Sequence, residues 1–332
     1  MNFVSIIVPC FNEEKTIALL LAAIYKQTYP VGQMEVIIAD GISADRTRDR
    51  INAFREDHPS LPVKILDNPS RSIPTGLNLA MEEAKGVIIL RLDAHSVPQS
   101  DYVERSVNGL LKGLGWNVGG VWEIQPGANG WIAESIASAA AHPFGVGDAR
   151  YRFTETAGAV DTVPFGAFKP TLIDEIGPFD ESLQANEDYE FNTRIRQAGG
   201  IVWLDPAIKS TYFARPNLLA LARQYTRYGY WKWQMLKRYP QTIRWRQALP
   251  PIYVLSLIAL PLLSFSMPQL GILWKAEVVS YALLLFIAGA IKGFQMSKPW
   301  LMIGLPLAFA TMHISWGAAF LWSILHSGIK KA

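Results

Sequence analysis

The sequence predicts an α/β protein in which a mostly parallel sheet flanked by helices is followed by interfacial helices and C-terminal transmembrane helices. Over residues 1–120, short apolar runs alternate with helical patterns, which is typical of a parallel sheet covered by helices on both faces. Beyond residue 248 the composition becomes strongly apolar, in runs close to the ~18 residues that cross a bilayer. A length of 332 residues allows one large or two medium-sized domains.

The first 120 residues are predicted to alternate between strands and helices. The strands are short apolar runs, and the helices repeat apolar residues at helical spacing. A proline at the start of the third helix and a glycine just past its end mark its bounds. The strands are Val4–Val8, Glu35–Ala39, Val63–Leu66 and Val87–Leu92, and the helices are Glu13–Gln27, Arg46–Asp57 and Pro74–Lys85.

The alternation weakens after residue 122 and then resumes. Residues 123–163 are rich in Gly, Ala and Ser and show little periodicity, so they are predicted to leave the sheet. Regular structure returns at residues 164–168, in a helix from about Asn186 to Gln197, and in a short strand, Ile201–Leu204.

Carboxylates stand at the ends of these buried elements. Asp40 and Asp93 each follow an apolar strand-like run, and Glu187 and Asp188 open the helix that starts at Asn186. Acids suit a helix N-terminus because the first-turn N–H groups and the macrodipole stabilise negative charge, so capping alone is one explanation. In a parallel sheet, however, ligands bind beyond the carboxyl ends of the strands. Acids in these three places predict an active site.

Charged and aromatic residues divide the chain at about residue 215. All 28 Asp and Glu residues except Glu277 precede that point, so the last third is strongly basic. Between residues 215 and 246, Arg and Lys are interleaved with Tyr and Trp, a composition that suits the bilayer interface. RNA stacking is the alternative for such a segment. The apolar runs that follow favour a membrane, and we expect no nucleic-acid partner.

Three apolar runs are candidate membrane spans. The first and third exceed ~18 residues and the middle one is short, so two to three spans are predicted. The positive-inside rule places the 215–246 segment in the cytoplasm. A third full crossing would put Lys330 and Lys331 outside, which the rule disfavours, so the number of crossings stays open. The runs are Leu249–Met267, Val278–Ile291 and Trp300–Leu325.

The N-terminal region fits a cytosolic location. Cys10 is the only cysteine, so no intrachain disulfide can form. The first apolar run lacks a basic leader and is too short for a signal peptide, so we expect it to be the first core strand.

Four sequence blocks, in a fixed order over most of residues 1–204, carry a resemblance to a known family. The chain resembles the family 2 glycosyltransferases, which have the GT-A nucleotide-diphospho-sugar transferase fold. Within that family it is most similar to the succinoglycan-type exopolysaccharide glucosyltransferases of bacteria. The blocks are Val4-Ser-Ile-Ile-Val-Pro-Cys-Phe-Asn-Glu-Glu14, Asp40-Gly-Ile-Ser-Ala-Asp-Arg-Thr47, Val87-Ile-Ile-Leu-Arg-Leu-Asp-Ala-His95, and Gly177-Pro-Phe-Asp180 with Asn186-Glu-Asp188.

The resemblance implies three regions and a set of nucleotide-sugar-binding residues. Residues 1–214 would be the GT-A catalytic domain, 215–248 an amphipathic basic and aromatic interfacial region, and 249–332 the transmembrane region.

Asp40 would accept a hydrogen bond from uracil N–H, and the alternative is an Asx turn that caps the following loop. Pro9 and Asn12 resemble the family's first nucleotide-contacting loop. Glu14 would contact the base or ribose, or else be a solvated helix residue. Arg71 resembles a basic residue beside the nucleotide, with an exposed loop arginine as the alternative.

Asp93-Ala94-His95 stands where the family has its Asp-X-Asp metal motif. A divalent metal, Mg²⁺ or Mn²⁺, that bridges two phosphates needs oxygen ligands, and Asp93 supplies one. His95 replaces the second acid, which is the main departure from the family pattern. Imidazole tolerates Mn²⁺ better than Mg²⁺, so His95 either favours manganese or only hydrogen-bonds a phosphate.

The resemblance assigns Asp188 the role of general base, because a carboxylate near the acceptor hydroxyl can take its proton as the donor is attacked. A single in-line displacement would invert the anomeric centre, so an α-linked UDP-sugar would give a β-linkage. Glu187 would support the loop or the acceptor. Phe165 and Gly166 resemble the family's acceptor-side strand, where small residues leave room for a sugar.

A further motif lies in the basic segment. Gln224-Tyr225-Thr226-Arg227-Tyr228 resembles the Gln-X-X-Arg-Trp motif of processive polysaccharide synthases, with Tyr in place of Trp. Arg227 would clamp the donor diphosphate in a bidentate manner, with an interfacial lipid contact as the alternative. The altered motif and the short membrane part argue against a synthase with its own polymer channel.

These observations predict a membrane-associated, metal-dependent, inverting glycosyltransferase of exopolysaccharide biosynthesis. Its catalytic domain would face the cytoplasm at the inner (plasma) membrane. The expected donor is a UDP-sugar, UDP-glucose by resemblance, and the expected acceptor is a lipid-linked saccharide on polyprenyl diphosphate. Other polysaccharide-assembly proteins are further candidate partners. The alternatives are a polyprenyl-phosphate glycosyltransferase, similar to the dolichyl-phosphate-mannose synthases, and a catalytically silent membrane scaffold.

Overall fold

The computed structural model describes residues 1–329, so Lys330 and Lys331 lie outside the described residues. The chain divides into two compact units. The first unit comprises Met1–Glu123 and Ala149–Tyr212, and the second comprises Ile124–Asp148 and the chain from Phe213 onward. The segment 124–148 therefore packs with the C-terminal helices, although it interrupts the first unit in sequence.

The first unit is built on a sheet whose strands run in the order β3-β2-β1-β4-β8-β6-β9-β5, with β7 paired to β9. The first four strands in that order are parallel to one another. β8 runs antiparallel to β4 and β6, and β5 and β7 run antiparallel to β9. The strands are β1 Val4–Cys10, β2 Met34–Asp40, β3 Val63–Asp67, β4 Ile88–Arg91, β5 Ser96–Pro98, β6 Asn117–Gln125, β7 Gly158–Ala159, β8 Ala167–Phe168 and β9 Val202–Phe213.

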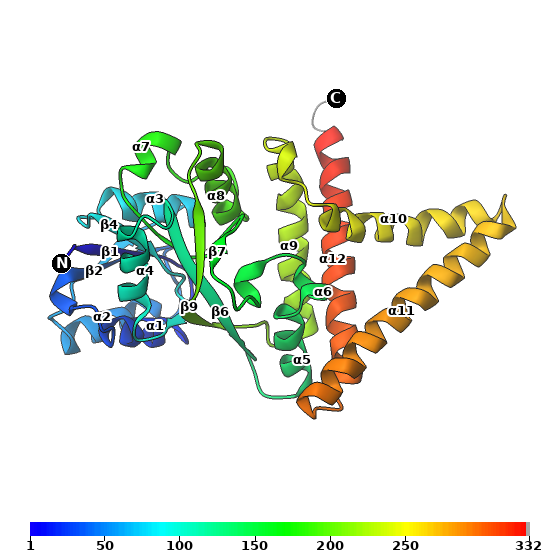
Figure 1. Ribbon diagram of the computed structural model, residues 1–332, viewed down its shortest axis with the longest axis horizontal. Helices are drawn as coiled ribbons and strands as arrows, with labels where there is room; N and C mark the ends of the chain where they lie inside the picture. Colours follow the sequence, from blue (N-terminus) through cyan, green and yellow to red (C-terminus); the bar gives the residue numbers. More distant parts are fainter. Residues whose placement is uncertain (330–332) are drawn as a thin grey trace. The chain divides into compact units, whose positions relative to one another are not determined.

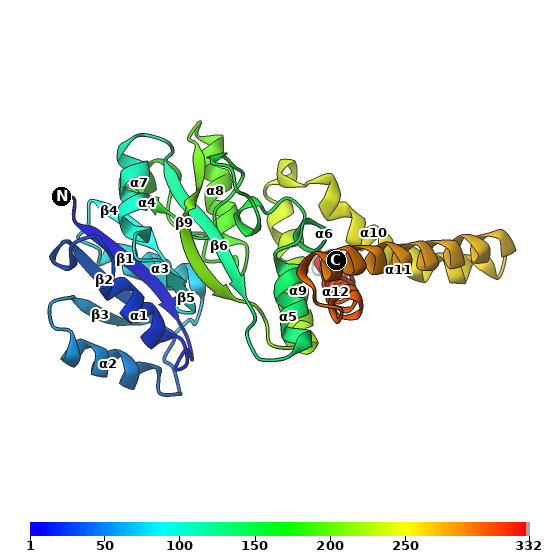
Figure 2. The ribbon, with the colours of Figure 1, turned by 60° about the horizontal axis from the view of Figure 1, so that its bottom comes forward.

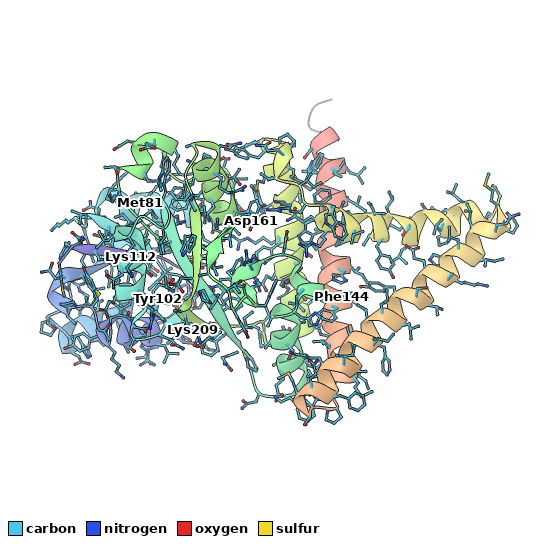
Figure 3. All side chains as sticks on the ribbon, in the orientation of Figure 1. Met81, Tyr102, Lys112, Phe144, Asp161 and Lys209 are labelled. Atoms are coloured by element: carbon cyan, nitrogen blue, oxygen red, sulfur yellow. The ribbon has the colours of Figure 1, made fainter. Side chains whose placement is uncertain are left out.

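Helices cover both faces of this sheet because neighbouring residues of the buried strands point to opposite sides. Ile6 belongs to a buried cluster that includes residues of α1, α2 and α4, whereas Ile7 belongs to a second cluster that includes residues of α3, α7 and α8. Figure 1 shows α1 and α2 side by side below β1 and β2, with α3, α7 and α8 above the strands, and Figure 2 shows the neighbouring strands β1, β2 and β3 with α1 and α2 beside them. Tyr102 of α4, labelled in Figure 3, is almost fully buried in the first cluster. The helices are α1 Ile17–Tyr25, α2 Thr47–Asp57, α3 Ile73–Glu82, α4 Tyr102–Leu111, α7 Leu172–Ile176 and α8 Glu187–Gln197, with short 3₁₀ turns η1 Val31–Gln33 and η2 Arg150–Arg152.

The predicted α/β class is confirmed, and the sheet proves to be mixed. All four strands predicted before residue 93 are present and parallel. The last strand, β9, is much longer than the predicted Ile201–Leu204 and reaches Phe213. Its burial alternates along the strand, so one face packs on the core.

The second unit consists of helices. Its members are α5 Trp131–Ala140, α6 Pro143–Val146, α9 Leu218–Leu236, η3 Pro240–Thr242, α10 Trp245–Ser264, α11 Pro268–Met296 and α12 Leu301–Ile329. α9 lies against α12 so closely that a Cβ on Gly229 would meet the carbonyl oxygen of Trp316 at 2.2 Å. α5 is tied to the same unit by the ion pair between Glu134 and Lys298 at 2.7 Å. Phe144, labelled in Figure 3, accepts a hydrogen bond from His313 of α12 through its carbonyl oxygen.

Within residues 1–329, three helices are long and apolar enough to cross a membrane, judged by length and composition. They are α10, α11 and α12. The predicted span Val278–Ile291 lies within α11, whereas α10 ends three residues before the predicted Met267 and α12 begins one residue after the predicted Trp300. The middle helix runs for 29 residues and is longer than its predicted apolar stretch. The prediction began only at Val278 because Lys275 and Glu277 interrupt the apolar run, but both residues lie within the helix. Glu277 Oε1 accepts a hydrogen bond from Ser256 of α10 at 2.6 Å, so one carboxylate oxygen is partnered inside the helical unit.

Candidate active site

The carboxyl ends of β1 and β2 bring the predicted nucleotide-binding residues together in the first unit. The parallel register pairs Pro9 with Ala39 and Cys10 with Asp40, so the loops that follow both strands begin side by side. Asn12 connects these loops: its N–H donates to Ser43 Oγ at 2.8 Å. The side-chain oxygen of Asn12 also accepts from the next backbone N–H, that of residue 44, at 2.9 Å.

Glu14 makes a second link between the same loops. Its carboxylate accepts from the backbone N–H of Arg46 at 3.2 Å, and its own N–H donates to Asp45. Glu14 therefore lies against the loop that follows Asp40 and helps to fix its shape.

The Asp40 carboxylate is fully buried and already well bonded. It accepts hydrogen bonds from the N–H and hydroxyl of Ser43 and pairs with Arg48 Nε. Arg48 also contacts Asp67 at the end of β3, so one guanidinium joins two strand ends. The geometry gives Asp40 the turn-capping role that the sequence left open, and the uracil contact stays a prediction.

Strained backbone is concentrated at this site. Within residues 1–329, five non-glycine residues have a positive φ, and Asn12 (54°), Ile42 (57°), Arg71 (55°) and Asn186 (65°) are four of them. Ile42 is β-branched, for which this conformation is a genuine outlier. Such strain persists only where the surroundings impose it, and it clusters at functional sites. The sequence carried no signal for Ile42.

Arg71 lies over the same loops. Its Nε donates to the carbonyl oxygen of Gly41 at 3.1 Å, and its guanidinium stacks 4.9 Å above the ring of Phe11. The arginine is thus fixed beside the loops after β1 and β2, although it is exposed.

Asp93 and His95 follow β4, at the same edge of the sheet. Asp93 Oδ1 lies 3.2 Å from Arg91 Nη2, and His95 Nδ1 lies 3.2 Å from Glu13 Oε1. The side chains of Asp93 and His95 are 21% and 32% exposed, so a ligand can reach both. Within residues 1–329, no group of three or more His, Cys, Asp or Glu side chains could hold a metal ion alone. A site with so few protein ligands fits a divalent ion that shares the phosphate oxygens of a bound donor.

Glu187 and Asp188 occupy the first turn of α8. Glu187 is buried and accepts a hydrogen bond from Arg91 Nη2 at 2.9 Å. Asp188 is partly exposed, and its Oδ1 accepts from the N–H of Tyr189 at 2.7 Å. Burial and the negative charge of Glu187 raise the pKa of Asp188 to about 7, against the opposing effect of Arg91. A carboxylate with such a pKa can accept and release a proton near neutral pH.

Buried polar contacts fix the direction of α8. Arg194 forms a bidentate pair with Glu190 and donates to the carbonyl oxygens of Gly177 at 2.9 Å and Pro178 at 2.8 Å. One arginine therefore joins α8 to the Gly177-Pro178 turn that precedes it.

Phe165 and Gly166 lie next to Asp188, and with Arg91 and Asn117 they line one small cavity. A Cβ on Gly166 would lie 1.9 Å from Asn117 Oδ1. Packing against Asn117 therefore requires glycine at this position, a reason that the sequence did not reveal.

An aromatic cluster near these residues was missed by the sequence analysis. The rings of Trp122 and Tyr212 stack 4.2 Å apart, and Trp122 lies 5.7 Å from Phe165. The guanidinium of Arg152 lies 4.7 Å above Trp122. The ring of His95 is 6.0 Å from that of Tyr212. Trp122 and Tyr212 belong to β6 and β9, whose pairing is a long-range feature, so no local pattern pointed to the cluster.

Gln224 and Arg227 belong to α9 of the second unit. Gln224 donates to the hydroxyl of Tyr228 at 2.9 Å, which joins two motif residues on one side of the helix. Their role toward a donor stays a prediction.

Comparison with known proteins identifies the family. The family model described as Glycosyl transferase family 2 matches residues 5–173, half of the chain. The chain belongs to glycosyltransferase family 2. The resemblance read from the four sequence blocks is thus confirmed, and the protein is a glycosyltransferase.

Two curated relatives extend over most of this glycosyltransferase. The succinoglycan biosynthesis protein ExoA of Rhizobium meliloti is 27% identical over 321 residues, which cover 95% of this chain and 93% of ExoA. The Methanococcus voltae protein is 29% identical over 255 residues, which cover 74% of this chain and 77% of its own. It is named dolichyl N-acetyl-alpha-D-glucosaminyl phosphate 3-beta-D-2,3-diacetamido-2,3-dideoxy-beta-D-glucuronosyltransferase.

A solved structure supports the fold. The mannosyltransferase PcManGT of Pyrobaculum calidifontis, in complex with GDP-Man and Mn²⁺, superposes with a TM-score of 0.61 at 21% identity. The match covers 97% of this chain and 87% of PcManGT. The GT-A fold predicted for this family 2 glycosyltransferase is confirmed.

Proposed function

We propose that this glycosyltransferase is membrane-associated and inverting, and that it moves glucose from UDP-glucose to a polyprenyl-diphosphate-linked saccharide in exopolysaccharide biosynthesis. The new bond would be a β-linkage. The observation that carries the proposal is that one arginine, Arg91, pairs with Asp93 and with Glu187, the residue directly before Asp188. Asp188 supplies a partly exposed base, and Asp93 supplies an oxygen ligand at the end of β4.

The chemistry follows from these positions. Asp188 takes the proton of the acceptor hydroxyl as its oxygen attacks C1 of the sugar, and the nucleoside diphosphate leaves with the bonding electrons. A divalent ion, when bound, would stabilise the negative charge of the leaving diphosphate. Asp93 and His95 would hold that ion. Attack opposite the leaving group inverts the anomeric centre.

The remaining predicted residues would bind the substrates. The proposed nucleotide-contacting residues are Pro9, Asn12, Glu14, Asp40 and Arg71. Phe165, Gly166 and Glu187 would shape the acceptor side, and Gln224 and Arg227 would contact the diphosphate. We propose residues 1–214 as the catalytic domain, 215–248 as the interfacial region and 249–332 as the transmembrane region, with the catalytic domain on the cytoplasmic face of the inner membrane.

Relatives and composition support a lipid-linked acceptor. ExoA acts in succinoglycan biosynthesis, and the name of the Methanococcus voltae protein specifies a sugar linked to dolichyl phosphate. The three long apolar helices of this chain fit a substrate that is anchored in a bilayer. PcManGT was solved with GDP-Man and Mn²⁺, so a guanosine donor and manganese belong in the test.

The test is a nucleotide-release assay on the full chain in detergent. UDP-glucose, other UDP-sugars and GDP-mannose are compared with Mg²⁺, Mn²⁺ or EDTA, with polyprenyl-diphosphate-linked saccharides or polyprenyl phosphate as acceptors. We expect metal-dependent UDP release that a lipid-linked saccharide stimulates, with a β-glucoside as product. A sugar phosphoester formed on polyprenyl phosphate would contradict the proposed acceptor, and release from GDP-mannose alone would contradict the proposed donor.

The raised pKa of Asp188 predicts the pH dependence of the reaction. The base must be ionised to act, and the ionised fraction grows as the pH rises through about 7. Below that pH, kcat/KM should fall by up to about tenfold per pH unit. Because Glu187 raises the pKa of Asp188, Glu187→Gln should move the acidic limb to lower pH.

The measurement is kcat/KM for the donor between pH 5 and 9, for wild type and Glu187→Gln. Glu175→Gln, an exposed acid of α7, is the matched control and should leave the profile unchanged. A flat wild-type profile, or a limb that Glu187→Gln moves to higher pH, would contradict the role of Asp188.

A further inference from the structure

Arg91, the last residue of β4, joins two carboxylates that are far apart in sequence. Its Nη2 lies 3.2 Å from Asp93 Oδ1 and 2.9 Å from Glu187 Oε1. The side chains of Arg91 and Glu187 are only 6% and 8% exposed, so water hardly reaches this contact. A hydrogen bond between ionised groups is strong in such surroundings, and the 2.9 Å contact between Arg91 and Glu187 has the expected length. A single guanidinium nitrogen therefore links the end of β4 to the first turn of α8.

The backbone of Arg91 is tied to the same helix by a second route. Its N–H donates to the carbonyl oxygen of Gly166 at 3.0 Å, and Gly166 packs directly on Asn117. Asn117 in turn donates to the side-chain oxygen of Asn192, further along α8, at 2.8 Å. Both the side chain and the main chain of Arg91 are thus connected to α8.

The other terminal nitrogen of Arg91, Nη1, makes no hydrogen bond within the described residues. That nitrogen is buried. An unsatisfied buried donor destabilises a fold, so native proteins rarely keep one without a functional reason. Arg91 also lines the small cavity that Asp188 and Phe165 share. If Arg91 served only to neutralise two acids, we would expect all of its nitrogens to be bonded.

We infer that Arg91 is a positioning residue that fixes the donor side of the active site relative to the acceptor side. It holds Asp93, the proposed metal ligand, and Glu187, the neighbour of the proposed base, on one planar group. The inference rests on the proposed function and adds to it a residue that lies inside a family block but was given no role there. The inference predicts that the donor side and the acceptor side of the site are coupled. A change at Arg91 or Glu187 should alter the metal concentration that the enzyme requires as well as kcat.

Arg91→Lys tests the coupling because lysine keeps the charge but loses the planar fork. An ammonium group cannot reproduce the geometry of both contacts. Residues that orient a metal ligand typically change affinity or activity by about 10- to 100-fold when they are replaced. We therefore expect kcat to fall by about 10- to 100-fold and the half-saturating Mn²⁺ concentration to rise by a similar factor. The melting temperature should stay close to that of the wild type.

Two further variants separate positioning from general stability. Glu187→Gln keeps the shape of the side chain and one acceptor oxygen, and Glu187 is not itself a proposed metal ligand. We expect Glu187→Gln to shift the metal titration through its contact with Arg91. In the double variant the two losses in metal affinity should overlap and not multiply, because both changes break the contact between Arg91 and Glu187. Arg105→Lys, at an exposed pair with Asp101, is the matched control and should change neither quantity.

Three outcomes would overturn the inference. They are a wild-type kcat and metal titration in Arg91→Lys, losses that multiply in the double variant, and an unchanged metal titration in Glu187→Gln. The last result applies even if Arg91→Lys does not fold, which a missing thermal transition would reveal. The wild type is measured in the same assay. Absence of metal-dependent nucleotide release from the wild type would refute the proposed function instead, and the two failures are therefore distinguishable.

Discussion

Asp188→Asn should reduce kcat by about 10²- to 10⁴-fold while donor affinity stays within a few-fold of wild type. Asparagine keeps the side-chain oxygen that accepts from the N–H of Tyr189 at 2.7 Å, so the first turn of α8 should keep its shape. It cannot take a proton at neutral pH, so the acceptor hydroxyl would attack without a base. The measurement is kcat for lipid-linked acceptor, together with the Kd for UDP from calorimetric titration.

The matched control is Asp174→Asn, which removes an exposed acid from α7 of the same unit. It should leave kcat unchanged. Turnover in Asp188→Asn within threefold of wild type would remove Asp188 as the base. A loss of UDP affinity in that variant would instead assign the residue to donor binding.

The parallel half of the sheet could be predicted because its strands are buried on both faces. β1 and β2 therefore read as continuous apolar runs, and each is followed by a helix with clear apolar spacing. The other half could not be predicted. β7 and β8 contain two residues each, too few for any periodicity, and Asp205-Pro206 inside β9 reads as the end of a strand.

The same contrast holds at the candidate site. Asp40, Asp93 and Asp188 were identified because each stands at the end of a buried element and within a family block. Arg91 was not identified, because the role of a basic residue inside an apolar run cannot be predicted until its acidic partner is known. That partner, Glu187, lies 96 positions later in the chain. Only the packing of α8 on the sheet brings the two side chains together.

Asp93→Asn should abolish most of the metal-dependent turnover, with a loss of about 10²- to 10³-fold at saturating Mn²⁺. The amide keeps the size of the carboxylate and an oxygen that can accept from Arg91, now 3.2 Å away. It removes the negative charge that an ion sharing the donor diphosphate needs, because few protein ligands surround that place within residues 1–329. The measurement is nucleotide release as a function of Mn²⁺ and Mg²⁺ concentration.

EDTA provides the internal comparison for this prediction. It should bring wild-type release down to the level of Asp93→Asn, and it should have little further effect on the variant. Asp101→Asn, in the exposed pair with Arg105, is the matched control and should keep the wild-type metal titration. An Asp93→Asn protein with an unchanged half-saturating Mn²⁺ concentration would exclude Asp93 as a metal ligand. His95 would then be the remaining side chain of the Asp93-Ala94-His95 motif able to bind the ion, and His95→Ala would be the variant that decides it.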